Sequence, residues 1–253
     1  MPVYTKLFGA FLVCAIVSYY TLCSLHISDI KKALCSKLLL LFLNAVFYVY
    51  ADLRFMPFLV YVVAITYVAG KVISKHNGSW FFYVFAVLEL LPLIALKTLD
   101  WMKIPGVFLP LGISFFTLQA FTYIYGVYRD EIAVSDLLSV ALFVSFFPSI
   151  TSGPILRAKD LVPQFQTIHP FEYDRFTDGL KLMAWGLFKK LVLADNMATY
   201  ISFVNSEAFE YGNVSGTAFL LTSILYSFQL YLDFSMLSAF FLERSFVSSF
   251  ELI

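Results

Sequence analysis

The chain has 253 residues, of which 60% are hydrophobic, 19% are aromatic and only 13% are charged, and its mean hydropathy is +0.82. Because soluble domains carry about 25% charged residues, a soluble globular protein is excluded. The 17 basic and 17 acidic residues cancel, so net charge gives no indication of nucleic-acid binding. The composition predicts an all-α, polytopic integral membrane protein in contact with membrane lipid.

Apolar stretches between groups of charged residues predict helices that cross the membrane, since a bilayer core about 30 Å thick requires roughly 17–25 helical residues. In chain order these stretches are Leu7–Leu25, Leu38–Ala51, Phe55–Gly70, Trp80–Leu96, Ile104–Tyr128, Leu137–Leu156 and Tyr211–Leu232. Gly179–Tyr200 is different, because a stripe with Leu180 and Leu191 alternates with one containing Lys181 and Lys189. This pattern indicates an amphipathic helix, either at the interface or facing a polar interior. We expect seven or eight membrane helices in one membrane domain, residues 1–253.

Lysines between the stretches predict the orientation. The loop after the first stretch carries Lys31, Lys32 and Lys37, and the loop after the third carries Lys71 and Lys75. Loops two apart share a side, and basic loops favour the cytoplasm, so the amino terminus is expected outside. The first stretch has no small-residue cleavage site and is expected to be retained as a helix.

Neither the cysteines nor the histidines indicate a metal centre. The cysteines lie in or beside the first two stretches without paired spacing and are interpreted as buried small apolar residues. The histidines all stand in expected loops, where solvation is the simpler interpretation. These residues are Cys14, Cys23, Cys35, His26, His76 and His169.

Two segments place proline and glycine inside apolar stretches and predict broken helices. Leu109–Gln119 contains a proline and a glycine two positions apart, and Phe146–Arg157 contains two prolines and a glycine. Backbone groups released at such a break need protein partners or a water-lined cavity, and we expect one break near Pro148–Pro154. A kinked packing helix is the alternative for the first segment. Arg157 is either a ligand for a phosphate or carboxylate or an anchor at the membrane surface.

Two later segments place charges beside apolar helices. Lys189 and Lys190 precede Asp195, which indicates either a local ion pair or a cationic rim suited to an anionic cofactor. Gln229–Ser235 ends the last apolar stretch and contains Asp233. An acidic residue at that place marks either a functional site in the bundle interior or the end of the helix at the interface.

These four segments, in this order, resemble the membrane-bound O-acyltransferase family, and most of all its branch of bacterial alginate and peptidoglycan O-acetyltransferase membrane subunits. The resembling segments are Leu109–Arg129, Phe146–Gln164, Gly179–Met197 and Ser227–Ser235. They span residues 109–235, whereas the first hundred residues are matched by hydropathy alone. The resemblance implies part of a helical funnel, with a tunnel lined by Ser114, Gln119, Pro154, Asp195, Asn196, Gln229, Asp233 and Ser235.

The resemblance also implies a reaction. An acyl group, acetyl in this branch, would pass from cytoplasmic acetyl-coenzyme A across the bacterial inner membrane to an exported cell-envelope polysaccharide or to an extracytoplasmic partner acetyltransferase. Arg157, Lys189 and Lys190 are the residues expected to bind the anionic donor. No resident cofactor and no metal are expected.

The family's functional histidine lies in a tryptophan–histidine motif beyond the aspartate–phenylalanine–serine segment. The 253 residues contain no such motif, and residues 236–253 depart from the family pattern. We therefore expect a truncated chain that is inactive alone, with none of its three histidines replacing the missing one. Two alternatives stay open. One is a transporter or flippase component of cell-envelope assembly, for which the broken helices and Glu89 are suited, and the other is a fragment without function.

Overall fold

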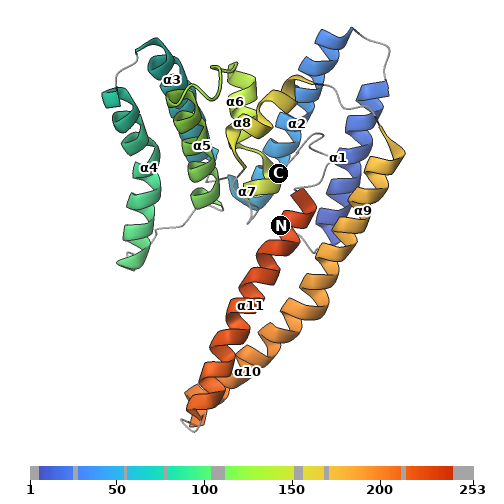
Figure 1. The fold of residues 1–253 in the computed structure, drawn as a ribbon, viewed down its shortest axis with the longest axis vertical. Coiled ribbons are helices and arrows are strands. Elements are labelled where there is room, and N and C mark those ends of the chain that lie inside the picture. Colours follow the sequence, from blue (N-terminus) through green and yellow to red (C-terminus); the bar gives the residue numbers. More distant parts are fainter. Residues whose placement is uncertain are drawn as a thin grey trace. The chain divides into compact units, whose positions relative to one another are not determined.

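The regular structure of the chain is helical in a computed structural model that describes residues 6–24, 28–53, 56–76, 79–103, 112–150, 156–167, 171–211 and 215–241 (Figure 1). No strand occurs among these residues, so the predicted all-α membrane fold is confirmed. The chain divides into two compact units, Met1–Phe171 and Glu172–Ile253. The single membrane domain and its funnel stay predictions.

The first unit contains eight α-helices and a short 3₁₀ helix in its described part. They are α1 (Lys6–Ser24), α2 (Asp29–Asp52), α3 (Met56–Lys75), α4 (Ser79–Trp101), α5 (Ile113–Tyr128), α6 (Leu137–Val144), α7 (Phe147–Ile150), α8 (Ala158–Leu161) and the 3₁₀ helix Pro163–Gln166. Helices α3, α4 and α5 pack against one another, and α6 lies against α2, α3 and α5. Tyr123 of α5 is fully buried beside Gly70 of α3, where a Cβ atom would lie only 3.0 Å from the tyrosine ring. Glycine therefore lets α3 and α5 approach closely.

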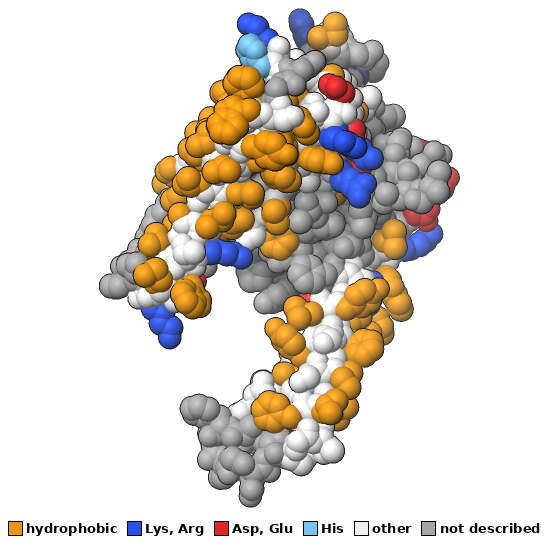
Figure 2. Space-filling model, turned by 60° about the vertical axis from the view of Figure 1, so that its left-hand side comes forward, with side chains coloured by type: hydrophobic (Ala, Val, Ile, Leu, Met, Phe, Trp, Pro, Cys, Tyr) orange, Lys and Arg blue, Asp and Glu red, His pale blue; other side chains and the backbone are white. Residues whose placement is uncertain are grey.

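Three helical segments in the described part of the chain are long and apolar enough to cross a membrane: Ile30–Tyr50, Met56–Lys75 and Ser79–Trp101. Phe8–Ser24 is a shorter apolar helix. The outward faces of these helices are hydrophobic: on α4, for example, Trp80, Val87 and Ile94 are 73%, 62% and 59% exposed. Figure 2 shows hydrophobic side chains gathered over one side of the molecule. Lipid is the environment in which such a surface is stable.

Two of the predicted spans are shorter in the structure. Ile104–Tyr128 was expected to contain a break or a kink within Leu109–Gln119, and α5 begins inside that segment, at Ile113, directly after Gly112 in a left-handed conformation with φ 72°. Glycine adopts that conformation without steric cost and so permits the break. Residues 104–111 lie outside the described part.

Leu137–Leu156 is also interrupted. Helix α6 ends at Val144, and the short α7 follows from Phe147 to Ile150. Pro148 has no N–H with which to bond the carbonyl of Val144, so a continuous helix would lose a hydrogen bond here. The described break, between Val144 and Phe147, lies just before the one predicted near Pro148–Pro154, and residues 151–155 of that segment lie outside the described part.

Several expectations for single residues were wrong. Cys14 and Cys35 are exposed and Cys23 is half-buried, because they lie on outward or partly covered faces of their helices. All three are free thiols. The lysines at positions 31, 32 and 37 lie in the first turns of α2 and not in a loop. His76 is exposed and stacks on Phe81, with 5.2 Å between ring centroids, whereas His26 and His169 lie outside the described residues.

The second unit is a pair of antiparallel helical rods in its described part. The first rod consists of α9 (Tyr173–Phe188), a π-helix (Lys189–Ala194) and α10 (Asp195–Tyr211), and α11 (Gly216–Phe241) packs along all three (Figure 1). The apolar stretch Tyr211–Leu232 was expected to be one helix, but α11 begins at Gly216, five residues after Tyr211. The buried positions Gly179, Gly186 and Ala194 are small, which lets neighbouring backbones come close.

The exposure of the two stripes predicted for the amphipathic segment differs from one residue to the next. Leu180 and Leu191 are exposed (47% and 52%), whereas Lys189, expected on the opposite, polar stripe, is half-buried. The prediction assumed α-helical spacing throughout. The π-helix from residue 189 to residue 194 changes that spacing and rotates the later side chains relative to the earlier ones.

Candidate functional site

A cluster of charged side chains joins the π-helix to α11. The ammonium Nζ of Lys190 lies 2.7 Å from Oδ1 of Asp233 and 3.1 Å from Oδ1 of Asp195. The local pair with Asp195 is the one that sequence spacing indicated. The shorter contact, with Asp233, joins residues 43 positions apart, which no local spacing could indicate.

Lys189 extends the cluster in the same direction. Its Nζ donates a hydrogen bond of 2.6 Å to Oγ of Ser235 on α11. Two consecutive lysines reach the same neighbour because a π-helix has more residues per turn than an α-helix, so that successive side chains diverge less. Gln229 is half-buried on α11 and stands four residues before Asp233, which places the two on one face.

The charges of this cluster balance. Burial of Lys190 opposes its charge, but hydrogen bonds and attraction from Asp233 and Asp195 outweigh this effect and hold the pKa of Lys190 above its ordinary value. The side chain of Lys190 is only 18% exposed and that of Asp233 is 30% exposed. Two lysines and two aspartates leave no surplus positive charge, so the cluster as it stands fastens the π-helix to α11.

A second polar site surrounds the break between α6 and α7. Asn44 of α2 donates from Nδ2 to Oγ of Ser145 (3.1 Å), and its Oδ1 accepts the backbone N–H of Phe147 (3.0 Å). Gln119 of α5 donates from Nε2 to the carbonyl oxygen of Phe143 (2.7 Å). Both side chains are buried. The backbone groups beside the break thus find protein partners, as a break inside a membrane requires.

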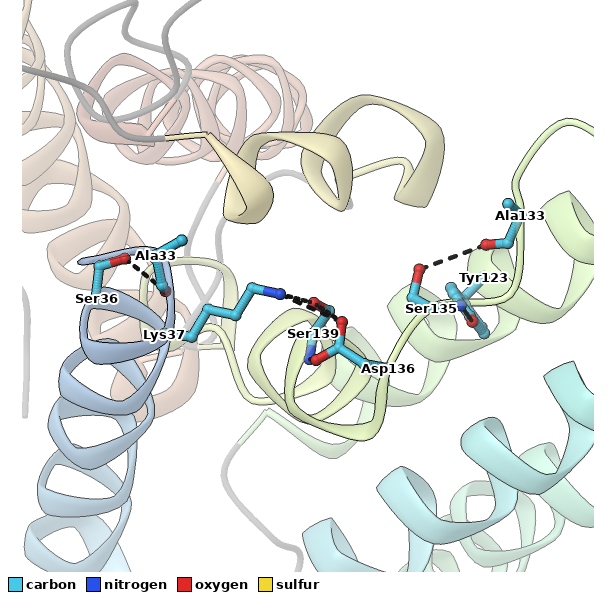
Figure 3. Close-up of polar contacts among 8 residues, drawn as sticks. All are labelled: Ala33, Ser36, Lys37, Tyr123, Ala133, Ser135, Asp136 and Ser139. Carbon is cyan, nitrogen blue, oxygen red and sulfur yellow. Dashed lines mark hydrogen bonds and ion pairs between the residues drawn. The ribbon is translucent and has the colours of Figure 1, made fainter. Parts of the chain in front are cut away.

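A third polar contact fastens α2 to the beginning of α6 (Figure 3). Asp136 is the N-cap of α6 and accepts the backbone N–H of Ser139 at 3.2 Å and its hydroxyl at 2.6 Å. Lys37 reaches from α2 to Asp136 (3.2 Å) and to the hydroxyl of Ser139 (2.8 Å). Partial burial opposes the ionisation of Asp136, but the bonds from Ser139 and Lys37 hold the pKa of this carboxyl below its ordinary value.

Comparison with known proteins relates this chain to membrane acyltransferases. No protein-family model matches it. It is 29% identical to a peptidoglycan O-acetyltransferase of Helicobacter pylori over 250 residues, which cover 81% of this chain and 46% of that protein. It is 38% identical to a probable alginate O-acetylase of Pseudomonas putida over 130 residues, which cover 51% of this chain and 26% of that protein. It is 29% identical to a teichoic acid D-alanyltransferase of Streptococcus thermophilus over 177 residues, which cover 68% of this chain and 42% of that protein.

These relatives are members of the membrane-bound O-acyltransferase family, and the chain is similar to them over part of their length. The predicted resemblance is thereby confirmed, and so is the branch, since relatives named for alginate and for peptidoglycan are both found. The chain spans less than half the length of these curated relatives.

The residues that the family resemblance singled out fall into two groups. The structure joins Lys189, Lys190, Asp195, Asp233 and Ser235, with Gln229 on the same face of α11, in the second unit. Asn196 belongs to that unit too, but it is exposed and donates to the carbonyl of Val192 in its own helix at 2.6 Å.

The first unit holds the others. Gln119 supports the helix break, and Ser114 is half-buried near the beginning of α5. Arg157 is exposed, directly before α8, and makes no side-chain hydrogen bond or ion pair within the described residues. Pro154 lies outside them. No group of three histidine, cysteine, aspartate or glutamate side chains that could hold a metal occurs in the described part of the chain.

Sequence reasoning missed Asn44 and Asp136. Asn44 carried a signal, because an amide in the middle of the apolar stretch Leu38–Ala51 needs a partner inside the membrane. Asp136 carried a weaker one, since an aspartate directly before an apolar helix is a common N-cap. The sequence does not indicate which residue each of them contacts, because the partners, Ser145 for Asn44 and Lys37 for Asp136, lie about 100 positions away.

Proposed function

We propose that this protein transfers an acyl group, acetyl in the simplest case, from acetyl-coenzyme A at the cytoplasmic side of the bacterial inner membrane to a cell-envelope polysaccharide or a partner acetyltransferase outside. The similarity to enzymes named for peptidoglycan, alginate and teichoic acid carries this proposal. In the reaction the thioester bond breaks as an ester bond to the acceptor hydroxyl forms, and the hydroxyl proton ends on the thiol of coenzyme A. The protein crosses the membrane several times, for which three described segments are long enough.

Arg157 is our first choice for the residue that meets the phosphates of the donor. Its guanidinium is exposed and without an ionic partner among the described residues, and arginine binds phosphate through paired hydrogen bonds. Lys189 and Lys190 already have partners on α11. In this proposal they hold the π-helix in place against α11.

Binding of the donor tests this assignment. The chain is reconstituted in lipid and titrated with labelled acetyl-coenzyme A, and Arg157→Gln is compared with Arg129→Gln, which removes another exposed arginine. We expect Arg157→Gln to weaken binding about tenfold, as the loss of one charge-assisted contact does, and Arg129→Gln to bind as the parent does. Equal affinity of all three proteins would contradict the role of Arg157.

Transfer itself tests the proposed function. Labelled acetyl-coenzyme A and a polysaccharide acceptor are supplied to membranes from cells that express the gene and from cells that lack it. We expect label in the polymer with the first membranes only. Equal labelling with both would count against acyl transfer by this protein.

Transport in cell-envelope assembly is the second candidate. The observation that favours it is the buried Glu89 in an apolar helix, since ionisable residues within membrane helices often serve transport. Movement of a fluorescent lipid-linked sugar across vesicles that contain the chain, in the absence of any acyl donor, would support transport over acyl transfer.

A further inference from the structure

Helix α4 buries a single ionisable side chain. Of its 23 residues only Phe82 and Glu89 are buried, and Glu89 is 0% exposed. Neighbouring positions face outward, for instance Val87 at 62% and Leu91 at 51%. The side of α4 that packs against α3 and α5 therefore carries a carboxyl group at the middle of an apolar segment long enough to cross a membrane.

Glu89 has one hydrogen-bond partner among the described residues. The hydroxyl of Thr66 on α3 donates to Oε1 of Glu89 at 3.2 Å, and it also lies 2.7 Å from the carbonyl oxygen of Val62. A hydroxyl has one proton, and the Val62 carbonyl is its closer acceptor. One long, shared hydrogen bond does little to stabilise a buried carboxylate.

The second carboxyl oxygen of Glu89, Oε2, is buried and has no hydrogen-bond partner among the described residues. A carboxylate would leave charge on this oxygen with nothing to stabilise it, whereas a neutral acid does not.

No charged group on the surrounding helices neutralises Glu89. In the described part of the chain, no lysine or arginine forms an ion pair with it. The hydroxyl of Tyr61 bonds the carbonyl of Leu88, that of Tyr123 accepts the N–H of Ser135, and the ammonium of Lys71 lies over the ring of Tyr67. The remaining titratable residues of α3, α4 and α5 are Lys75, Tyr83, Lys97, Asp100, Tyr125 and Tyr128, and none has a hydrogen bond or ion pair with Glu89.

We propose that Glu89, with Thr66 beside it, forms a proton-binding site inside the membrane. The carboxyl group holds a proton at neutral pH and exchanges it with solvent. An unpaired carboxylate in this apolar surrounding would cost far more free energy than a neutral acid, so the proton is the ligand that makes the buried position stable. The site does not depend on the acyl-transfer activity.

Infrared spectroscopy of the chain in lipid tests the site. A protonated carboxylic acid has a carbonyl stretching band that a carboxylate lacks, and at neutral pH the exposed acids are ionised. We expect a band worth one acid per chain that shifts when glutamate is labelled with ¹³C, shifts in D₂O, and falls reversibly as the pH is raised. It should vanish in Glu89→Gln and persist in Glu131→Gln, which alters an exposed acid.

Each other result counts against the proposal. Absence of the band at neutral pH would show that Glu89 is ionised. A band that does not shift in D₂O would show that the proton of the acid does not exchange with solvent. Because the isotope shifts are measured on the unaltered chain, the conclusion stands even where a variant does not fold.

Discussion

The hydroxyl of Tyr61 on α3 lies 3.1 Å from the backbone carbonyl oxygen of Leu88 on α4. Four residues later stands Pro92, inside the helix, with no N–H to offer this carbonyl. Tyr61 therefore supplies the hydrogen bond that Pro92 removes. We predict that Tyr61→Phe lowers the free energy of unfolding by about 0.5–1.5 kcal/mol, the usual contribution of one such bond, as measured by unfolding in detergent.

Pro92→Ala provides the control for this prediction. An alanine at position 92 restores the backbone N–H, so the carbonyl of Leu88 regains its helical partner. Tyr61→Phe should then cost clearly less in the Pro92→Ala background than in the parent. Equal costs in both backgrounds would mean that the tyrosine contributes by packing alone.

Lys190 and Asp233 should be coupled. Lys190→Met leaves the carboxylate of Asp233 half-buried without its closest cation and should lower the free energy of unfolding by about 1–3 kcal/mol. The matched control is Lys181→Met, which breaks a pair of similar length, 2.8 Å, whose side chains are 74% and 70% exposed. Surface pairs contribute little, so this control should unfold as the parent does.

A double-mutant cycle completes that test. Lys190→Met combined with Asp233→Asn should cost less than the sum of the two single changes, because the second change removes the unpaired charge that the first leaves behind. Strict additivity would show that the two side chains do not stabilise each other.

Asn44 should be intolerant of apolar replacement. Asn44→Leu leaves the N–H of Phe147 and the hydroxyl of Ser145 without their partner at the break between α6 and α7, which should cost about 1–3 kcal/mol. Asn196→Leu changes an exposed asparagine and should alter stability by less than about 0.5 kcal/mol. Thermal unfolding in one detergent ranks the two variants, and similar losses would contradict a specific role of Asn44.

The contact of Asp136 with Lys37 and Ser139 should weaken in acid. Since the folded pKa of Asp136 lies below its ordinary value, its stabilising effect is present above the unfolded value of about 3.9 and is lost as the pH falls through the folded value. Asp136→Asn should therefore be less stable than the parent at about pH 7, and the difference should shrink below about pH 4. A difference independent of pH would show that charge is not involved.

The apolar helices could be predicted because every side chain on their outer faces contacts lipid and must therefore be apolar. The expected stretch Trp80–Leu96 falls within α4 (Ser79–Trp101), and all of Phe55–Gly70 except Phe55, which lies outside the described residues, falls within α3 (Met56–Lys75). Hydropathy does not show where the backbone leaves the helix inside an uncharged stretch. The break after Val144 depends on Asn44, which belongs to a distant part of the sequence, whereas α5 begins after the left-handed Gly112.

The candidate site was predictable residue by residue but not as an arrangement. The family resemblance singled out Lys190 and Asp233 separately, and local spacing paired Lys190 with Asp195 alone. The dominant contact joins two helices, so it follows from their packing. Glu89 attracted attention by its charge, but only burial on the inner side of α4 shows that it needs a proton.

The π-helix at residues 189–194 has a consequence for how this segment compares with its relatives. A wide turn of this kind holds one residue more than the α-helical turn it replaces. A protein with an unbroken α-helix between the same two ends would therefore be one residue shorter there, and a single inserted codon is the simplest origin of the difference. Such an insertion would turn two adjacent lysines toward α11, where Ser235 and Asp233 accept their hydrogen bonds.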